Sequence, residues 1–132
     1  EMISNEEKIT QAVLVSVDTG DYDAEASLAE LKELVKSAGA EPVFTVTQNL
    51  KRPETGTYVG TGKLQEIADI CKQQEIDLLV FDCELSPTQI RNIEAETDTR
   101  TIDRTMLILD IFALRARSKE GKLQVELAQQ ST

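Results

Sequence analysis

The part of this chain most similar to a phosphate-binding loop is a glycine-rich segment with a lysine near its end. It covers residues 56–64 and reads GTYVGTGKL. The P-loop pattern G-x-x-x-x-G-K-[ST] is not met, because Thr57 replaces the first glycine and Leu64 replaces the Mg²⁺-binding hydroxyl. Glycines before a helix can present backbone N–H groups to an anion, or they can simply form a tight turn with unusual φ angles. The residues of this candidate anion site are Gly60, Gly62 and Lys63.

Carboxylate and amide side chains follow several segments that are expected to be strands. In an open α/β sheet these side chains would meet at the carboxyl edge, where ligands bind, and their oxygen atoms could hold Mg²⁺. Each acid also has a local explanation, because Asp18 suits a turn, Asp82 ends a strand and Asp103 suits a helix N-cap. We favour the local explanation and assign no metal ligand and no catalytic residue. The side chains concerned are Asp18, Gln48, Asp82 and Asp103.

Composition excludes several classes of site. The chain has 132 residues and no histidine, so it lacks the commonest general base near neutral pH and the commonest metal ligand. Two cysteines, Cys71 and Cys83, cannot form a structural zinc site alone, and we expect them to be reduced thiols of a cytoplasmic protein. No apolar run approaches the roughly 20 residues that span a bilayer, so no membrane insertion is predicted.

The charge is acidic overall and uneven along the chain. The net charge is −10, which disfavours nonspecific binding to nucleic acid, but residues 100–132 carry a net charge of +2. Lys51 and Arg52 form an exposed basic tip in the loop before Pro53. The arginines near the C-terminus could contact phosphate, or they could only complement the negative end of a helix. This second basic set comprises Arg100, Arg104, Arg115, Arg117, Lys119 and Lys122.

Strand and helix patterns alternate regularly along the chain. Apolar runs predict buried strands. Stripes of apolar residues with helical spacing predict the helices that follow the strands. Strands are predicted at 12–17, 43–48, 77–81 and 99–102, and helices at 24–38, 63–74, 87–95 and 104–117. Ser86 and Gln89 form a capping-box pattern, and Gly39 is placed to end the first helix. The predicted fold is therefore α/β, with an open, mainly parallel four-stranded sheet flanked by helices.

The C-terminal part reads as a connection to another element. Residues 106–114 (MLILDIFAL) are apolar nearly all round, so this helix must be buried in the domain or meet a neighbour. Ser118 would cap a further helix, whose stripe of Leu123, Leu127 and Ala128 requires a partner. We predict an N-terminal tail over 1–11, an α/β domain over 12–117 and the truncated start of a helical linker over 118–132. An oligomerisation module built on residues 106–114 is an alternative.

Several strings together resemble one family. They are YVGTGK (58–63), FDCELSPTQIRNIE (81–94), the VTQ…RP of 46–53, and IDRTMLILDIFALRARSKEGKLQVELAQ (102–129). These residues resemble the N-terminal part of HflX, a ribosome-associated GTPase, over almost the whole chain after about Ala12. Ser131 and Thr132 depart from the pattern.

The resemblance implies more than the residues alone. In that family an α/β domain leads through a helical, coiled-coil linker into a GTP-binding domain, and the protein binds the large ribosomal subunit and splits stalled or idle ribosomes, notably under heat stress. GTP and Mg²⁺ belong to the GTP-binding domain, which has no counterpart here, so this chain alone is predicted to be inactive as a GTP hydrolase. We expect contacts with rRNA and with that domain, and a location in the cytoplasm with association to the ribosome or to a membrane.

The resemblance also suggests particular residues. An adenine-nucleotide activity attributed to the N-terminal region of the family points to Gly60, Gly62 and Lys63, and an ATP-hydrolysing domain is therefore an alternative function. The family's entry into the linker matches the C-terminal basic residues. The residues predicted to contact rRNA are Lys51, Arg52, Arg115, Arg117, Lys119 and Lys122.

Overall fold

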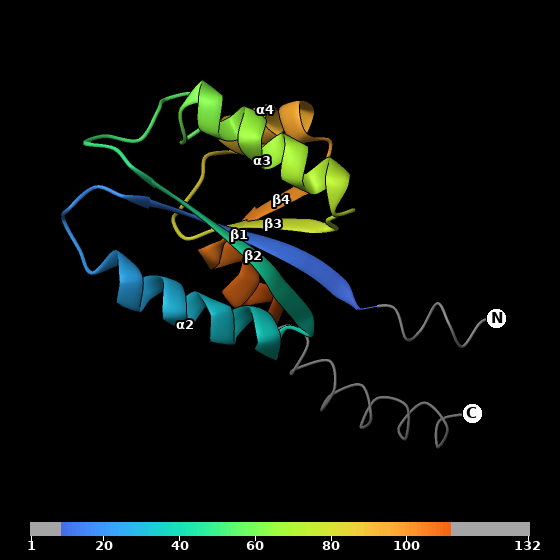
Figure 1. Cartoon of the computed structure of the whole chain (residues 1–132). Coiled ribbons are helices and arrows are strands. Elements are labelled where there is room, and N and C mark those ends of the chain that lie inside the picture. Colours follow the sequence, from blue (N-terminus) through green and yellow to red (C-terminus); the bar gives the residue numbers. More distant parts are fainter. Residues whose placement is uncertain (1–8, 112–132) are drawn as a thin grey trace, which may run out of the picture.

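The fold is a sheet between two layers of helices (Figure 1). The computed structural model describes residues 9–111. Its elements in chain order are β1 (Thr10–Asp18), α2 (Ala24–Ser37), β2 (Ala40–Asn49), α3 (Thr61–Gln73), β3 (Leu78–Phe81), α4 (Pro87–Thr97) and β4 (Arg100–Asp103), followed by a helix over residues 104–111. The predicted α/β class is confirmed. The linker start at 118–132 lies outside the described residues.

All strand pairs in the sheet are parallel, in the order β2-β1-β3-β4. The chain leaves β1 towards β2 on one side and later returns to pair β3 with the other side of β1. The direction of the connections therefore reverses between β1 and β3. In open α/β sheets, the carboxyl ends of the strands at such a reversal are the usual place for a ligand.

Each face of the sheet has its own apolar core, because β1 turns alternate side chains to opposite faces. Val13 and Val15 lie in the core beneath α3 and α4, whereas Ala12 and Leu14 lie in the core beneath α2 and the helix over 104–111 (Figure 1). All four side chains are buried. Cover on both faces explains why β1 is a continuous apolar run rather than an alternating one.

The structure corrects several predicted boundaries. β1 begins at Thr10, inside the predicted N-terminal tail, and α3 begins at Thr61 rather than Lys63. β2 begins at Ala40 rather than Val43, because residues 40–42 pair with β1 although they include Pro42. Between Ala12 and Val13 the pairing register shifts by one residue, which leaves Val43 without a partner in β1, and pairing continues at Phe44. Pairing with a neighbouring strand outweighs the low strand propensity of this segment.

The predicted start of α4 and the predicted end of α2 are confirmed. Ser86 Oγ accepts a hydrogen bond from the Gln89 N–H at 3.1 Å, and Gln89 Oε1 accepts one from the Ser86 N–H at 2.9 Å. This is the predicted capping box, with Pro87 as the first helical residue. Gly39 follows the end of α2 with φ +91°, a left-handed conformation that glycine adopts at little cost.

The helix over 104–111 is amphipathic, with one side buried in the domain and the other side exposed. The alternative that part of this helix meets a neighbour stays a prediction. Leu107 and Ile111 are buried against α2 and the sheet, whereas Leu109 is 61% exposed and Met106 is 36% exposed. Within the described residues, no helix is both long and apolar enough to cross a membrane.

Candidate functional site

The carboxyl edge of the sheet holds the predicted acids, and two of them, Asp18 and Asp103, bind backbone N–H groups of the surrounding loops. Asp18 Oδ1 accepts the Gly20 N–H at 2.9 Å in a turn. Asp103 caps the helix over 104–111 by accepting the Met106 N–H at 2.9 Å, and its other oxygen accepts the Leu85 N–H at 2.8 Å. Among residues 9–111, no group of three or more cysteine or acidic side chains is placed to hold a metal ion. The acids therefore shape the loops at this edge.

Asp82 is the exception, because it forms a buried ion pair. Its side chain is 1% exposed, and Oδ1 accepts a hydrogen bond from Arg104 Nη1 at 2.7 Å. Arg104 also donates to the carbonyl and hydroxyl oxygens of Ser27, at 3.2 and 3.1 Å, and to Glu30. One guanidinium thus joins the end of β3, α2 and the first turn of the helix over 104–111. Asp82 Oδ2 is buried without a hydrogen-bond partner in the described structure.

Aromatic side chains and a thiol lie at the reversal point between β1 and β3. The Tyr22 hydroxyl donates to the Val17 carbonyl at 3.0 Å. The Tyr58 ring meets Phe81 edge-on, with centroids 6.5 Å apart and planes at 89°. Burial raises the pKa of the Cys83 thiol to about 12; a hydrogen bond with Tyr58 opposes this shift, and nearby carboxylates add to it. The thiol therefore stays protonated near neutral pH, which argues against a nucleophilic role.

The segment of the candidate anion site is fixed by neighbouring side chains. Residues 54–58 close a tight loop, in which the N–H groups of Glu54 and Tyr58 each donate to the other's carbonyl at 3.0 Å. Two side chains of α4 donate to carbonyls of this loop: Asn92 to Gly56 at 2.9 Å, and Gln89 to both Glu54 and Thr55. The long connection between β2 and α3 is therefore held against α4.

Gly60 is the N-cap of α3, and it lies against the side chain of Gln48. Its N–H donates to Gln48 Oε1 at 3.0 Å, and a Cβ at this position would meet Gln48 Nε2 at 3.2 Å. Gln48, one of the side chains considered at the sheet edge, contacts this turn. Lys63 Nζ lies 3.1 Å from Glu66 Oε1 one turn further along α3, and Gly62 faces open space. The structure brings the three residues together at one helix end; nucleotide binding there stays a prediction.

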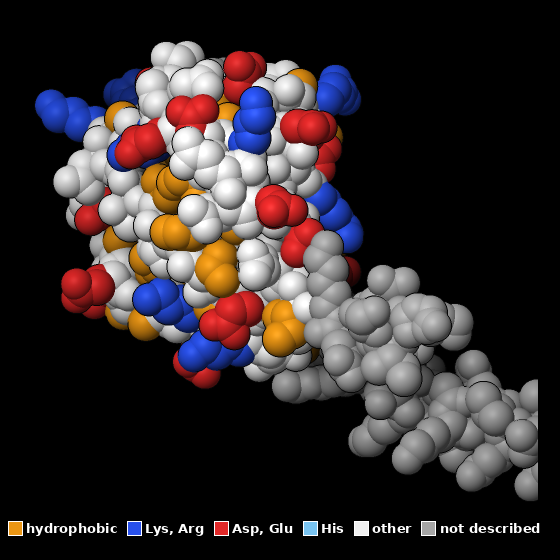
Figure 2. Space-filling view, turned by 45° about the vertical axis from the view of Figure 1, so that its right-hand side comes forward, with side chains coloured by type: hydrophobic (Ala, Val, Ile, Leu, Met, Phe, Trp, Pro, Cys, Tyr) orange, Lys and Arg blue, Asp and Glu red, His pale blue; other side chains and the backbone are white. Residues whose placement is uncertain are grey.

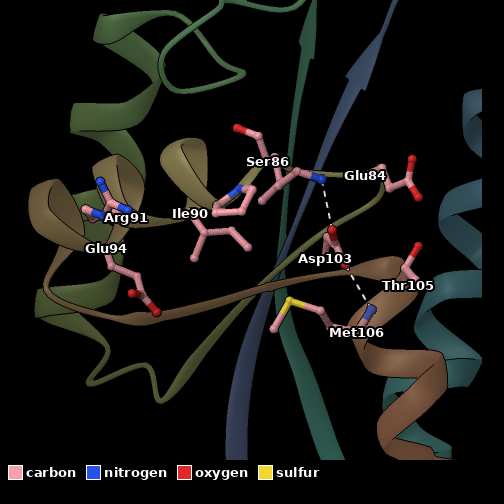
Figure 3. A pocket seen from close by; sticks show the side chains of 10 residues that line it. Glu84, Ser86, Ile90, Arg91, Glu94, Asp103, Thr105 and Met106 are labelled. Atoms are coloured by element: carbon pink, nitrogen blue, oxygen red, sulfur yellow. Dashed lines mark hydrogen bonds between the residues drawn. The ribbon is translucent and has the colours of Figure 1, made fainter.

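An open groove of about 800 Å³ lies between α4 and the start of the helix over 104–111 (Figure 3). Leu85, Ile90 and Met106 give it apolar walls. Charged side chains lie at its rim, with Glu94 and Arg91 on the α4 side (Figure 3). The groove could accept an apolar side chain, and it contains none of the predicted anion-binding residues.

The predicted basic residues fall into two groups. Lys51 and Arg52 are exposed in the loop after β2, and neither makes an ion pair within residues 9–111. Figure 2 shows Lys and Arg side chains dispersed among Asp and Glu on the face in view, without a broad basic area. The other residues predicted to contact rRNA lie outside the described residues; they are Arg115, Arg117, Lys119 and Lys122.

The pairing of Asp82 with Arg104 does not follow from the predicted strands, because it depends on where β4 ends. β3 and β4 are parallel neighbours, and Phe81 pairs with Asp103. The residues that follow, Asp82 and Arg104, are therefore adjacent at the ends of neighbouring strands. The predicted strand ended at Ile102 instead, and aligning it with the end at Phe81 would have placed Asp82 beside Asp103, a like charge.

The chain resembles GTP-binding proteins in sequence. Residues 25–113 match the family described as GTP-binding GTPase N-terminal. The GTPase HflX of Lacrimispora saccharolytica is 53% identical over 130 residues, which cover 98% of this chain and 31% of the relative. The GTPase HflX of Escherichia coli is 52% identical over 120 residues, which cover 90% of this chain and 28% of the relative. The chain thus spans about 30% of the length of these relatives.

A solved structure shares the fold. A GTP-binding protein from the archaeon Sulfolobus solfataricus, in complex with GDP, matches with a TM-score of 0.61 and 31% identity. The match covers 92% of this chain and 36% of that protein. The arrangement of strands and helices described above is therefore also found in a GTP-binding protein.

Proposed function

Because this chain belongs to the GTP-binding GTPase N-terminal family and its relatives are HflX GTPases, we propose that it is the ribosome-binding domain of such a GTPase. The domain would contact rRNA of the large subunit, and the whole protein would separate stalled or idle ribosomal subunits with the use of GTP. The observation that carries this proposal is the family match over residues 25–113. GTP and Mg²⁺ would bind in a GTP-binding domain outside this chain.

The loop after β2 supports contact with rRNA. Lys51 and Arg52 are adjacent, exposed and at the carboxyl edge of the sheet, where the connecting loops meet. The rest of this acidic chain repels phosphate, so binding has to rely on a few well-placed cations. Arginine can contact a phosphate with two parallel hydrogen bonds, and lysine contributes a point charge.

The helix over 104–111 supports a role in communication with a following domain. Leu107 and Ile111 pack it against α2, and Arg104 joins its first turn to Asp82 and Ser27. Its direction is thereby fixed relative to the sheet. A ribosome contact that shifts α2 or the sheet edge would therefore change the position of the residues that follow this helix.

Salt-dependent binding to large ribosomal subunits tests the proposal. In the full-length GTPase, Lys51→Glu with Arg52→Glu should weaken co-sedimentation and reduce the slope of log binding constant against log salt by about two, one for each lost phosphate contact. The matched control is Lys32→Glu with Lys72→Glu, which changes the charge equally at exposed positions on α2 and α3. The control should leave the slope unchanged.

Two results would contradict different parts of the proposal. If the unmodified protein does not sediment with large subunits at low salt, ribosome binding is wrong. If it does, and the Lys51 and Arg52 variant binds as well as the unmodified protein at every salt concentration, ribosome binding stands but this loop does not contact rRNA.

A further inference from the structure

The outer side of β2 is a strand edge without a neighbour in the described structure. β2 is the longest described strand, with 10 residues, and it pairs only with β1. The backbone N–H and C=O groups on the open side of such a strand can pair with another chain. Val43 and Phe44 on this strand are also exposed, by 37% and 41%.

The first half of this edge is unsuited to pairing, and the second half is regular. Pro42 has no N–H to donate, and the register shift between Ala12 and Val13 places an irregularity at Val43. Beyond it, the Leu50 N–H donates to the Asp18 carbonyl at 3.2 Å, so even-numbered residues of β2 turn their backbone groups towards β1. The residues that turn theirs outwards are Thr45, Thr47 and Asn49, and all three are exposed.

We propose that this edge of β2 pairs antiparallel with β2 of a second copy of the chain, with the two-fold axis at Thr47. This register pairs Thr47 with itself and Thr45 with Asn49 of the other copy. It thereby joins every outward-facing residue beyond the irregularity in hydrogen-bonded pairs. A register centred on Thr45 would instead place Thr47 against the irregular Val43. The result is one continuous sheet with the two β2 strands at its centre, an arrangement closed by two-fold symmetry.

Side chains favour a second copy as the occupant. Phe44 lies on the same face as buried Val46, and the proposed register places it opposite Leu50 of the other copy, so that an exposed ring gains an apolar partner. Glu41 lies near one end of β2, and Lys51 and Arg52 follow the other end. Antiparallel pairing brings these opposite charges to the same end, whereas parallel pairing would superimpose like charges. The edge is therefore complementary to itself.

A cysteine at the two-fold axis tests the register directly. Directly opposed residues of a hydrogen-bonded antiparallel pair have Cα atoms about 5.5 Å apart, within the range of a disulfide. Under mild oxidation of the chain, Thr47→Cys should form a covalent dimer at least about tenfold faster than Ala29→Cys, an exposed control on α2. The native cysteines give little background, because Cys71 is buried and the Cys83 thiol resists ionisation. Equal rates for the two variants would overturn the proposal.

A mass measurement checks the same surface without a covalent bond. By light scattering, the mass of the unmodified chain should rise towards that of two copies between about 5 and about 500 μM, the range expected for a small, weak interface. Thr47→Lys places like charges opposite each other at the axis and should keep the chain monomeric. The control Ala29→Lys should dimerise like the unmodified chain. A monomer at every concentration, or association that survives Thr47→Lys, would overturn the proposal. Neither readout involves ribosomes, so the result is independent of the proposed function.

Discussion

Removing the Arg104 side chain should destabilise the fold strongly, because it leaves a buried carboxylate without its counter-ion. Asp82 is 1% exposed at its side chain, and its hydrogen bond with Arg104 is 2.7 Å long. Breaking a buried ion pair from one side costs about 3–5 kcal/mol. The Arg104 side chain is 23% exposed, so some water replaces it, and exposed Glu30 adds little. We therefore expect Arg104→Ala to reduce the free energy of unfolding by about 2–4 kcal/mol.

A double-mutant cycle with urea unfolding, followed by circular dichroism at pH 7, measures the pair. Asp82→Asn alone leaves a partly solvated cation and should cost less than Arg104→Ala. The double variant should cost less than the two single changes together, with a coupling energy of about 1–3 kcal/mol. Arg91→Ala on α4 removes an exposed arginine as a control and should stay within about 0.5 kcal/mol of the unmodified chain. A loss below about 1 kcal/mol for Arg104→Ala, or single effects that simply add, would refute this reasoning.

Three further predictions concern the carboxyl edge of the sheet. With its pKa raised to about 12 by burial, Cys83 should react with iodoacetamide at pH 8 on the order of a thousandfold more slowly than glutathione, as measured by mass spectrometry. Because the thiol has its ordinary pKa in the unfolded chain, the unfolded chain loses this proton at a lower pH than the folded chain. The free energy of unfolding should therefore fall as pH rises above about 8.5, and it should fall less steeply in Cys83→Ala. An identical slope in the two proteins would contradict this prediction. For the candidate anion site, calorimetry with millimolar ATP and Mg²⁺ should show heat that Lys63→Ala removes and that Lys72→Ala, at the other end of α3, retains. Heat that survives Lys63→Ala, or no heat at all, would rule out nucleotide binding at this helix end.

Much of the fold could be predicted because the local signals and the tertiary pairing agree. The apolar run at 12–17 is covered on both faces, and the Ser86 capping box determines where α4 begins. The first residues of β2 were missed because Glu41 and Pro42 have low strand propensity. Only their position beside β1, with a register shift to accommodate them, makes them part of the strand.

The candidate site was harder to predict, because contacts across the fold decide it. The turn at Asp18 and the helix cap at Asp103 could be predicted, since both need only residues nearby in sequence. The bond from the Leu85 N–H to Asp103 could not, because the two residues are 18 positions apart. Gln48 binds Gly60 across the loop between β2 and α3, and Arg104 reaches α2, 77 residues away at Ser27. Neither contact follows from helix or strand periodicity. The exposure of Leu109 has the same origin, because the sheet and α2 cover only one side of its helix.

The two proposed surfaces of this chain share one loop, and that limits how they can be used. Lys51 and Arg52 follow β2 directly, and the proposed register places Lys51 opposite Val43 of the second copy. An rRNA strand that contacts Lys51 would need the space that the second copy occupies in the dimer. The dimer and the ribosome-bound form would therefore exclude each other, and ribosomal subunits would bind only the monomer. Since Pro42 and the irregularity at Val43 leave only three outward-facing residues beyond them, the dimer is held by few backbone hydrogen bonds. Such a weak association would let ribosomes compete for the chain without a separate step to release it.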